Sequence, residues 1–202
     1  MALWLPDQPL VLASKSEVRR MIVEAAGIPV DVRPAEIDER SIEAGAGGAP
    51  ARDIARMLAL VKTRTVADAV PGRLVLGADQ TLAFGSEILS KPLDLAAAHA
   101  QLVRMRGLTH ELHSAIAVAR DKTVLFEHVA TARLTMRPFS EDFVDRYLET
   151  VGFAALTSVG AYQIEGIGIH LFERIEGDQF TIMGLPLLPL LNFLRDEGCI
   201  ET

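Results

Sequence analysis

The first part of the chain constrains the fold most, because a strand pattern, a helix pattern and a second strand pattern follow one another there. The apolar run Pro9–Ala13 is short and ends at a serine, which is typical of a buried strand. Apolar residues then recur at helical spacing from residue 17 onward, with Ser16 as a candidate N-cap and Gly27 as a candidate stop. Residues 28–33 repeat the strand pattern. The segment therefore predicts a strand–helix–strand unit, a building block of α/β folds.

The rest of the chain mixes further helices with long hairpins. Helices are predicted over residues 51–69 and 94–106, after a cap at Ser140, and over residues 182–195, entered through Gly184-Leu185-Pro186. Strands are predicted over residues 73–77, ending at Ala78-Asp79, over 168–175, and in two hairpins, 81–84 with 87–89 and 109–119 with 123–135. Residues 35–50, which contain acids, Gly and Pro, are predicted to be a loop. This mixture predicts an α/β fold with a mixed, twisted sheet and flanking helices.

Composition limits the class of protein. The chain has 202 residues, 50% of them hydrophobic, which suits one domain over residues 1–202 with a sizeable core. Its net charge of -7 argues against sequence-independent binding of nucleic acid, although a few cations can still form a local pocket for a small anion. Cys199 is the one cysteine, so neither an internal disulfide nor a cysteine-based zinc site is expected. No apolar run suits a membrane span and the N-terminal residues do not resemble a signal peptide, so we expect a soluble, cytoplasmic protein with no membrane partner.

The junction between the first strand and the first helix is a candidate phosphate site. A helix N-terminus offers unpaired N–H groups and a partial positive charge. Ser14, Lys15, Ser16, Arg19 and Arg20 add hydroxyls and cations within about one turn. The alternative is a capped helix whose basic face is simply solvated.

Acidic residues supply a second candidate site. Asp79 follows a strand that is predicted to be buried, and carboxylates at such positions can hold a divalent cation or accept a proton from water. The alternative for Asp79 is a turn or cap residue. Glu36, Asp38 and Glu39 form an acidic loop that could bind a hard cation, but such loops are commonly just solvated. Taken by themselves, these residues indicate only a pocket for a metal ion and phosphate, and they do not identify a reaction.

Taken together, these residues resemble the Maf family of nucleoside triphosphate pyrophosphatases. The matching motifs run in order through nearly the whole chain: LAS-x-S-xx-RR at 12–20, IDE at 37–39, Lys62, GAD at 77–79, EIL-x-KP at 87–92, GLTH at 107–110, GAY-x-IEG at 160–166, FERIEG at 172–177 and GLPL at 184–187. The resemblance implies an elongated, two-lobed fold like that of the inosine triphosphatases with a central active-site cleft, and commonly a homodimer. It also implies cleavage of the α–β phosphoanhydride of a nucleoside triphosphate, giving the monophosphate and pyrophosphate.

The resemblance also implies roles for individual residues. Asp79 is expected to activate water as proton acceptor and, with Glu39, to hold Mg²⁺ or Mn²⁺. Phosphate contacts are expected from Ser14, Arg19, Lys62 and Lys91, the two lysines being catalytic with Asp79. Such a set fits phosphoryl transfer, which depends mainly on positioning and on stabilisation of negative charge.

Three positions bear on the substrate. The family branch that acts on dTTP and UTP has motifs similar to S-x-SPRR, GADT and IQG. At the matching positions this chain has Val18, Gln80 and Glu165. Those residues resemble the branch that acts on N7-methyl-GTP, CTP and UTP. The Glu165 carboxylate could accept hydrogen bonds from the N1–H and exocyclic amine of guanine. The alternative for Glu165 is an ion pair with a structural arginine.

We therefore expect an enzyme that removes modified or non-canonical nucleoside triphosphates, with a substrate similar to N7-methyl-GTP. The alternative from another class is a nucleotide-binding regulator of septum formation that acts through partners. A phosphatase that releases orthophosphate from the terminal position is a further alternative and differs in its product.

Overall fold

The computed structural model describes residues 3–201, and these divide into two compact units. Unit 1 comprises residues 3–80, 114–130 and 184–201, and unit 2 comprises residues 81–113 and 131–183. The prediction of one domain covered residues 1–202, of which Met1, Ala2 and Thr202 lie outside the described residues. The active-site cleft expected between two lobes stays a prediction.

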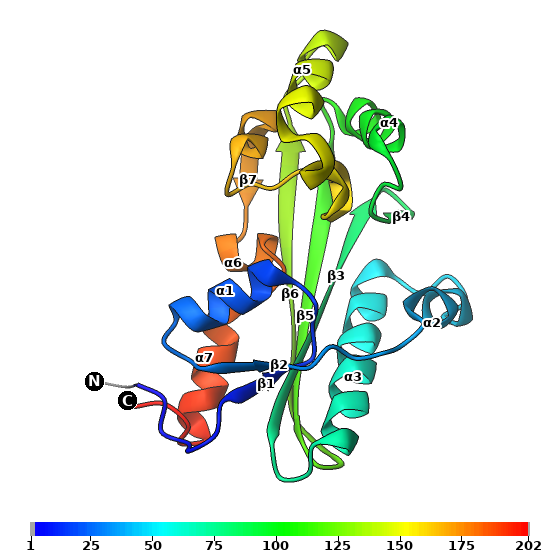
Figure 1. The fold of residues 1–202 in the computed structure, drawn as a ribbon. Coiled ribbons are helices and arrows are strands. Elements are labelled where there is room, and N and C mark those ends of the chain that lie inside the picture. The colour runs from blue at the N-terminus through cyan, green and yellow to red at the C-terminus, as the bar shows by residue number, and fades with distance from the viewer. Residues whose placement is uncertain (1–2, 202) are drawn as a thin grey trace. The chain divides into compact units, whose positions relative to one another are not determined.

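The sheet is mixed, as predicted, and its strands occur in the order β2-β1-β3-β5-β6-β7, with β4 paired to β3. Strand β1 pairs in parallel with β2 and β3, whereas β3 with β4 and β6 with β7 are antiparallel. The long strands β3, β5 and β6 each contribute residues to both units. The strands, labelled in Figure 1, are β1 Leu10–Leu12, β2 Val30–Val32, β3 Leu74–Phe84, β4 Glu87–Leu89, β5 Thr109–Arg120, β6 Thr123–Met136 and β7 Phe172–Glu176.

Unit 1 begins with the predicted strand–helix–strand unit. Strand β1 is fully buried and is followed by α1 (Glu17–Ala25). The Ser16 side chain accepts a hydrogen bond from the Arg19 N–H and so caps the helix, and Gly27 ends the turn after it with a φ of 78°. Both local signals identified in the sequence are confirmed.

Helices cover both faces of the sheet within unit 1. On β6, Phe126 stacks on Phe193 of α7 (Leu187–Asp196), whereas the adjacent Glu127 pairs with Arg56 of α3 (Ala51–Ala69). Consecutive residues of a strand point to opposite faces, so α3 and α7 lie on opposite sides of the sheet, as Figure 1 also shows. Val66 and Ala67 of α3, with Val70 directly after the helix, pack on Val11 and Val75 of the sheet.

The prediction of a loop over residues 35–50 is wrong in part, because Glu39–Gly45 form the helix α2. The Asp38 side chain accepts a hydrogen bond from the Ser41 N–H, 3.1 Å away, and so caps this helix. Of the Gly and Pro residues that suggested a loop, Gly45 is the last residue of the helix, and Gly47, Gly48 and Pro50 follow it.

The prediction that a strand ends at Ala78-Asp79 is also wrong, because β3 runs without interruption through both residues. Strand β3 pairs with β1 at Val75 and Leu76 and with β4 from Leu82 onward, and the residues between stay buried. Asp79 therefore lies in the interior of a strand. The predicted hairpin turn at Gly85-Ser86 is confirmed.

Strand β3 and helix α3 approach each other closely at Gly77. A Cβ atom at Gly77 would lie 2.2 Å from Thr63 Oγ1 and 2.7 Å from the Ala59 carbonyl oxygen. Thr63 Oγ1 also donates to the Ala59 carbonyl, at 2.7 Å. The absence of a side chain at residue 77 thus sets the distance between helix and strand.

Unit 2 contains α4 (Leu95–Met105), α5 (Glu141–Val151) and the short α6 (Gln179–Ile182), together with the 3-10 turns η1 (Gly152–Leu156), η2 (Val159–Ala161) and η3 (Ile167–Leu171). Asp94 and Ser140 cap α4 and α5, the second as predicted. The strand predicted over 168–175 is η3 followed by β7. The helix predicted over 182–195 begins only at Leu187, because Gly184 has a φ of 94° and Pro186 supplies the N-cap.

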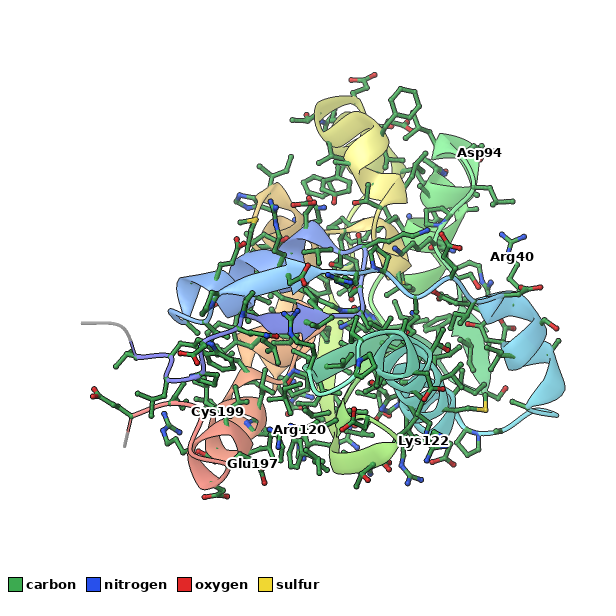
Figure 2. The ribbon with its side chains drawn as sticks, turned by 60° about the horizontal axis from the view of Figure 1, so that its bottom comes forward. Arg40, Asp94, Arg120, Lys122, Glu197 and Cys199 are labelled. Atoms are coloured by element: carbon green, nitrogen blue, oxygen red, sulfur yellow. The ribbon has the colours of Figure 1, made fainter. Side chains whose placement is uncertain are left out.

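The lone Cys199 is buried after α7, and Figure 2 shows it at the same end of unit 1 as Glu197 and Arg120. Burial raises the pKa of the Cys199 thiol, which keeps it protonated near neutral pH. Within residues 3–201, the helices are all too short or too polar to cross a bilayer.

Candidate active site

Lys62 forms the centre of a cluster of charges in unit 1. Its Nζ lies 2.6 Å from Asp79 Oδ1 and 2.9 Å from Glu39 Oε1. The Lys62 and Asp79 side chains are only 9% and 8% exposed, whereas that of Glu39 is 49% exposed. Helix α3 supplies Lys62, strand β3 supplies Asp79 and the first residue of α2 supplies Glu39. Three residues predicted from the sequence are thereby brought together.

Ser14 and Arg19 lie at the candidate phosphate site, in the same unit. Ser14 is buried directly after β1, and its Oγ accepts from the Ser16 N–H at 3.3 Å and from Arg19 Nη1 at 3.2 Å. Arg19 Nη1 also donates to the carbonyl of Ala78, 2.8 Å away, next to Asp79. The guanidinium of Arg19 is therefore held beside the carboxylate that was predicted to be catalytic.

Burial and charge act in opposite directions on these groups. Burial raises the pKa of the Asp79 carboxyl, and the positive charges of Lys62 and Arg19 offset part of the increase. Burial lowers the pKa of the Arg19 guanidinium, and the carboxylates of Asp79 and Glu39 oppose that change. A carboxyl with a raised pKa beside two cations is suited to accept a proton from a water molecule that they hold.

The other residues of the predicted phosphate site have separate roles. Arg20 forms an ion pair with Glu17, 2.6 Å away on the exposed surface of α1, as the solvated-face alternative expects. Lys15 is exposed. Asp38 caps α2, and Glu36 is exposed.

Two of the three predicted specificity residues are in unit 1. Gln80 follows Asp79 on β3 and donates from Nε2 to Ser114 Oγ at 2.8 Å. Val18 is half-buried in the first turn of α1, beside Arg19 in the sequence. Neither position carries a charge.

Lys91 and Glu165 belong to unit 2. Lys91 is exposed, lies two residues after the end of β4 and precedes Pro92. Glu165 is also exposed, and within residues 3–201 it forms no ion pair, so the alternative of a structural arginine partner finds no support. Burial raises the pKa of Tyr147 to about 12, and the nearby Glu165 carboxylate contributes to the increase.

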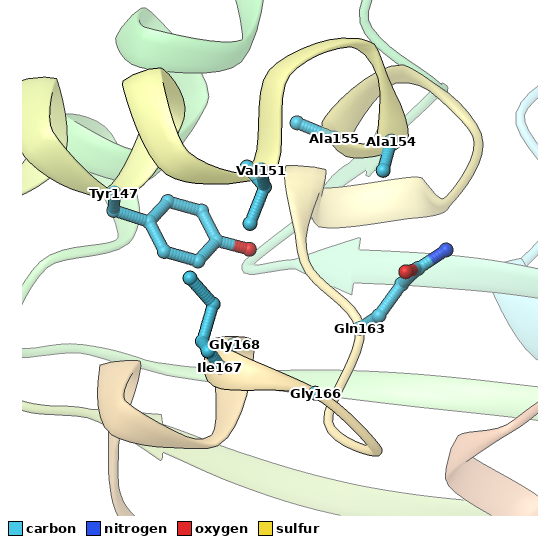
Figure 3. Close-up of a pocket in the computed structure, with 8 residues that line it drawn as sticks. All are labelled: Tyr147, Val151, Ala154, Ala155, Gln163, Gly166, Ile167 and Gly168. Carbon is cyan, nitrogen blue, oxygen red and sulfur yellow. The ribbon is translucent and has the colours of Figure 1, made fainter.

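A small pocket in unit 2 has lining residues from both sides of Glu165 in the sequence. Helix α5 supplies Tyr147 and Val151, and the segment around Glu165 supplies the opposite wall (Figure 3). The remaining lining residues are Ala154, Ala155, Gln163, Gly166, Ile167 and Gly168. A Cβ atom at Gly168 would lie 2.4 Å from the Gln163 carbonyl, so this turn requires glycine.

Two residues of the cluster in unit 1 were not identified from the sequence. Burial and the charges of Asp79 and Glu39 raise the pKa of Glu43, which places its carboxylate near them, while Lys62 and Arg40, labelled in Figure 2, oppose the increase. Glu43 follows Glu39 by four residues, a spacing that signals a shared face only once α2 is known to be a helix. The carbonyl of Gly184 accepts from Arg19 Nε at 2.8 Å, and a backbone acceptor leaves no signal in side-chain chemistry.

The carboxylates fit a magnesium or manganese ion only in part. Hard cations of this kind are commonly held by one or two carboxylates, with water and substrate phosphates as the other ligands. Glu39 and Asp79 are such a pair, although no group of three or more His, Cys, Asp or Glu residues in the described chain could hold a metal. The residues thus suit an ion that the substrate itself helps to hold.

Comparison with known proteins identifies the relatives of the chain. The family described as Maf-like protein matches residues 9–197. A nucleoside triphosphate pyrophosphatase of Rhodopseudomonas palustris (strain ATCC BAA-98 / CGA009) is 56% identical over 202 residues, covering 100% of both chains. A 7-methyl-GTP pyrophosphatase of Rhizobium etli is 52% identical over 194 residues, covering 95% of this chain and 98% of that protein. A solved dITP/XTP pyrophosphatase from Mycobacterium abscessus is 15% identical, with a TM-score of 0.42 and coverage of 95% of each chain.

Proposed function

Because the chain belongs to the Maf family, we propose that it is a nucleoside triphosphate pyrophosphatase. The reaction is hydrolysis of the α–β phosphoanhydride, which gives a nucleoside monophosphate and pyrophosphate. The observation that carries the proposal is the contact of Lys62 with both Asp79 and Glu39, next to an Arg19 whose guanidinium is held by Ser14 and Ala78. A base and several fixed cations are the parts that this reaction needs.

Asp79 takes a proton from the attacking water. As the water oxygen bonds to the α-phosphorus, the bond between that phosphorus and the bridging α–β oxygen breaks, and pyrophosphate leaves. The raised pKa of Asp79 makes its carboxylate a stronger base than an ordinary aspartate, and Lys62 Nζ, 2.6 Å away, fixes its orientation. Arg19, Lys62 and Lys91 balance the negative charge of the phosphates, and the Ser14 hydroxyl supplies a further polar contact.

Glu39 and Asp79 would hold the Mg²⁺ or Mn²⁺ ion, with phosphate oxygens and water completing the coordination. When bound, such an ion lowers the pKa of water and withdraws charge from the phosphates. Lys62 contacts one oxygen of each carboxylate, and each carboxylate has a second oxygen with which to bind a cation.

For the substrate, we propose a modified or non-canonical nucleoside triphosphate similar to N7-methyl-GTP. Glu165 supports this choice, because its exposed carboxylate forms no ion pair in the described chain and can accept from the N1–H and amino groups of guanine. The methylated guanine ring is cationic, which favours a carboxylate further. The relative named 7-methyl-GTP pyrophosphatase, at 52% identity, is consistent with that class.

The test is a panel assay of the pure protein with Mg²⁺ or Mn²⁺. The panel contains the standard ribo- and deoxyribonucleoside triphosphates and N7-methyl-GTP, with pyrophosphate and orthophosphate measured separately. We expect equal amounts of pyrophosphate and monophosphate, loss of activity with EDTA, and the highest kcat/KM for N7-methyl-GTP. Orthophosphate alone would indicate a terminal phosphatase, and nucleotide binding without either product would favour the regulator of septum formation.

The expected homodimer is tested separately, by light scattering on the same sample. A mass near twice 21.9 kDa is the expected result, and a mass near 21.9 kDa would reject it.

A further inference from the structure

Arg19 is fixed through two of its three guanidinium nitrogens by three acceptors. Its Nε donates to the Gly184 carbonyl at 2.8 Å, and its Nη1 donates to the Ala78 carbonyl at 2.8 Å and to Ser14 Oγ at 3.2 Å. Within residues 3–201, Nη2 has no hydrogen-bond partner. The guanidinium is planar and rigid, so fixing Nε and Nη1 also fixes the direction in which the Nη2 hydrogens point.

Gly184 lies directly beside the edge of Arg19 that stays open. A Cβ atom at residue 184 would stand 3.4 Å from both Nε and Nη2 of Arg19, and 3.6 Å from Gln80 Oε1. The φ of Gly184 is 94°, a conformation that residues with a side chain rarely adopt. Glycine at this position thus does two things: its carbonyl binds Nε, and its missing side chain leaves space beside Nη2.

We propose that Gly184 is a positioning residue for Arg19, which holds the guanidinium so that its Nη2 edge stays open to an oxygen of a phosphate group. The proposal rests on the proposed function in so far as the phosphate belongs to a nucleotide. A guanidinium that is already oriented loses less conformational freedom when it binds an anion, which improves affinity without a new contact. The residue acts through Arg19 and makes no contact with substrate through a side chain.

The test compares Gly184→Ala with Gly198→Ala. Gly198 is the matched control, because its φ of 67° imposes a similar backbone strain on alanine while an added Cβ would meet nothing within 4 Å. Calorimetry measures the binding of inorganic pyrophosphate with Mg²⁺, and thermal melting measures the stability of both variants. We expect Gly184→Ala to weaken pyrophosphate binding about tenfold, the scale of one charge-assisted hydrogen bond, and Gly198→Ala to leave it unchanged.

A double-mutant cycle shows whether the effect passes through Arg19. The Arg19→Lys variant keeps the charge but loses the planar donors. Relative to that variant, adding Gly184→Ala should weaken pyrophosphate binding by less than about twofold. If Gly184→Ala does not fold, Gly184→Asn takes its place, since Asn tolerates positive φ better than Ala.

Three outcomes would overturn the inference: equal affinities of the Gly184→Ala and Gly198→Ala variants, additive effects in the Arg19→Lys background, or no pyrophosphate binding by the unmodified protein. The proposed function fails by a different result, namely no pyrophosphate release from any nucleotide in the panel. Even if no nucleotide is hydrolysed, binding of pyrophosphate by the unmodified protein would still allow the variants to test whether Gly184 positions Arg19.

Discussion

Both units bury polar groups, but they balance the burial in different ways. In unit 1 the buried polar residues include a charged pair, Lys62 and Asp79, whose Nζ and Oδ1 lie 2.6 Å apart. Unit 2 contains neutral hydrogen-bonded pairs: His110 Nε2 and the Tyr162 hydroxyl lie 2.6 Å apart, and the Tyr147 hydroxyl donates to the Ala161 carbonyl at 3.1 Å.

The pKa values follow this difference. Burial lowers the pKa of His110 to about 4 and raises that of Tyr147 to about 12, so both stay uncharged near neutral pH. Burial also raises the pKa of Asp79, but Lys62 and Arg19 oppose it. Buried charges are costly for stability and are therefore a marker of chemistry, whereas neutral hydrogen-bonded pairs mainly specify packing. The comparison assigns reactivity to the cluster in unit 1 and structure to that in unit 2.

The strongest test of this contrast is Asp79→Asn. The amide keeps the size of the side chain but cannot act as a base, so turnover should fall roughly 100-fold or more while the protein stays folded. Pyrophosphate release and circular dichroism measure the two effects. The exposed Asp68 of α3 supplies the control, Asp68→Asn, which should keep full turnover. Near-normal turnover of Asp79→Asn would remove Asp79 from the mechanism.

Lys62→Gln tests the charge balance itself. Loss of a fixed cation should lower turnover on the order of 100-fold, as for the loss of one preorganised donor. Without the opposing charge, the pKa of Asp79 rises further, so the acid limb of the pH–rate profile should move to higher pH. Lys122→Gln, in the exposed turn between β5 and β6, is the control. An acid limb that stays in place would show that Lys62 does not set the basicity of Asp79.

His110→Gln tests the neutral pair of unit 2. The pKa of His110 is about 4 when folded, below its ordinary value of 6.5, so its neutral form stabilises the fold fully above about pH 6.5 and less as the pH falls. In the unmodified protein, protonation of His110 in the unfolded chain should lower the free energy of unfolding by about 2 kcal/mol between pH 7 and pH 5. This part of the decrease should be absent in His110→Gln. Urea titrations at the two pH values measure it. The exposed His170 provides the control, His170→Gln, and an unchanged pH dependence in His110→Gln would refute the assignment.

Glu165→Gln is expected to have the smallest effect and concerns the substrate rather than the reaction. A carboxylate that accepts from guanine should be worth about tenfold in kcat/KM for N7-methyl-GTP, and less for UTP. The measurement is the ratio of the two kcat/KM values. Equal losses for both nucleotides would reject a contact between Glu165 and the base.

Local features were predictable from the sequence because their hydrogen bonds lie within a few residues. The Ser16 cap, the Gly27 stop and the Gly85-Ser86 turn are of this kind. Helix α2 was missed because its cap, Asp38, lies in an acidic stretch that is equally typical of a loop. The continuity of β3 was missed because a buried carboxylate inside a strand is stable only through Lys62, a partner on another element.

The site was predictable as a set of residues but not as an arrangement. Ser14, Arg19, Glu39, Lys62 and Asp79 were all named in advance, by resemblance more than by physics. Their contacts depend on the packing of α3 against β3 and on the turn before α7, which involve residues far apart in the chain. Glu43 and Gly184 follow from that packing and were visible only in the structure.

The close approach at Gly77 has a consequence for engineering. Replacing a strand glycine by alanine is a common way to raise thermal stability, because alanine restricts the unfolded chain. Here the added methyl group would stand 2.2 Å from Thr63 Oγ1 and would push α3 away from β3. Lys62 precedes Thr63 and Asp79 lies two residues beyond Gly77, so the same shift would also strain the ion pair, and the entropic gain would be outweighed. Selection for heat resistance and selection for catalysis should therefore both keep glycine at this one position.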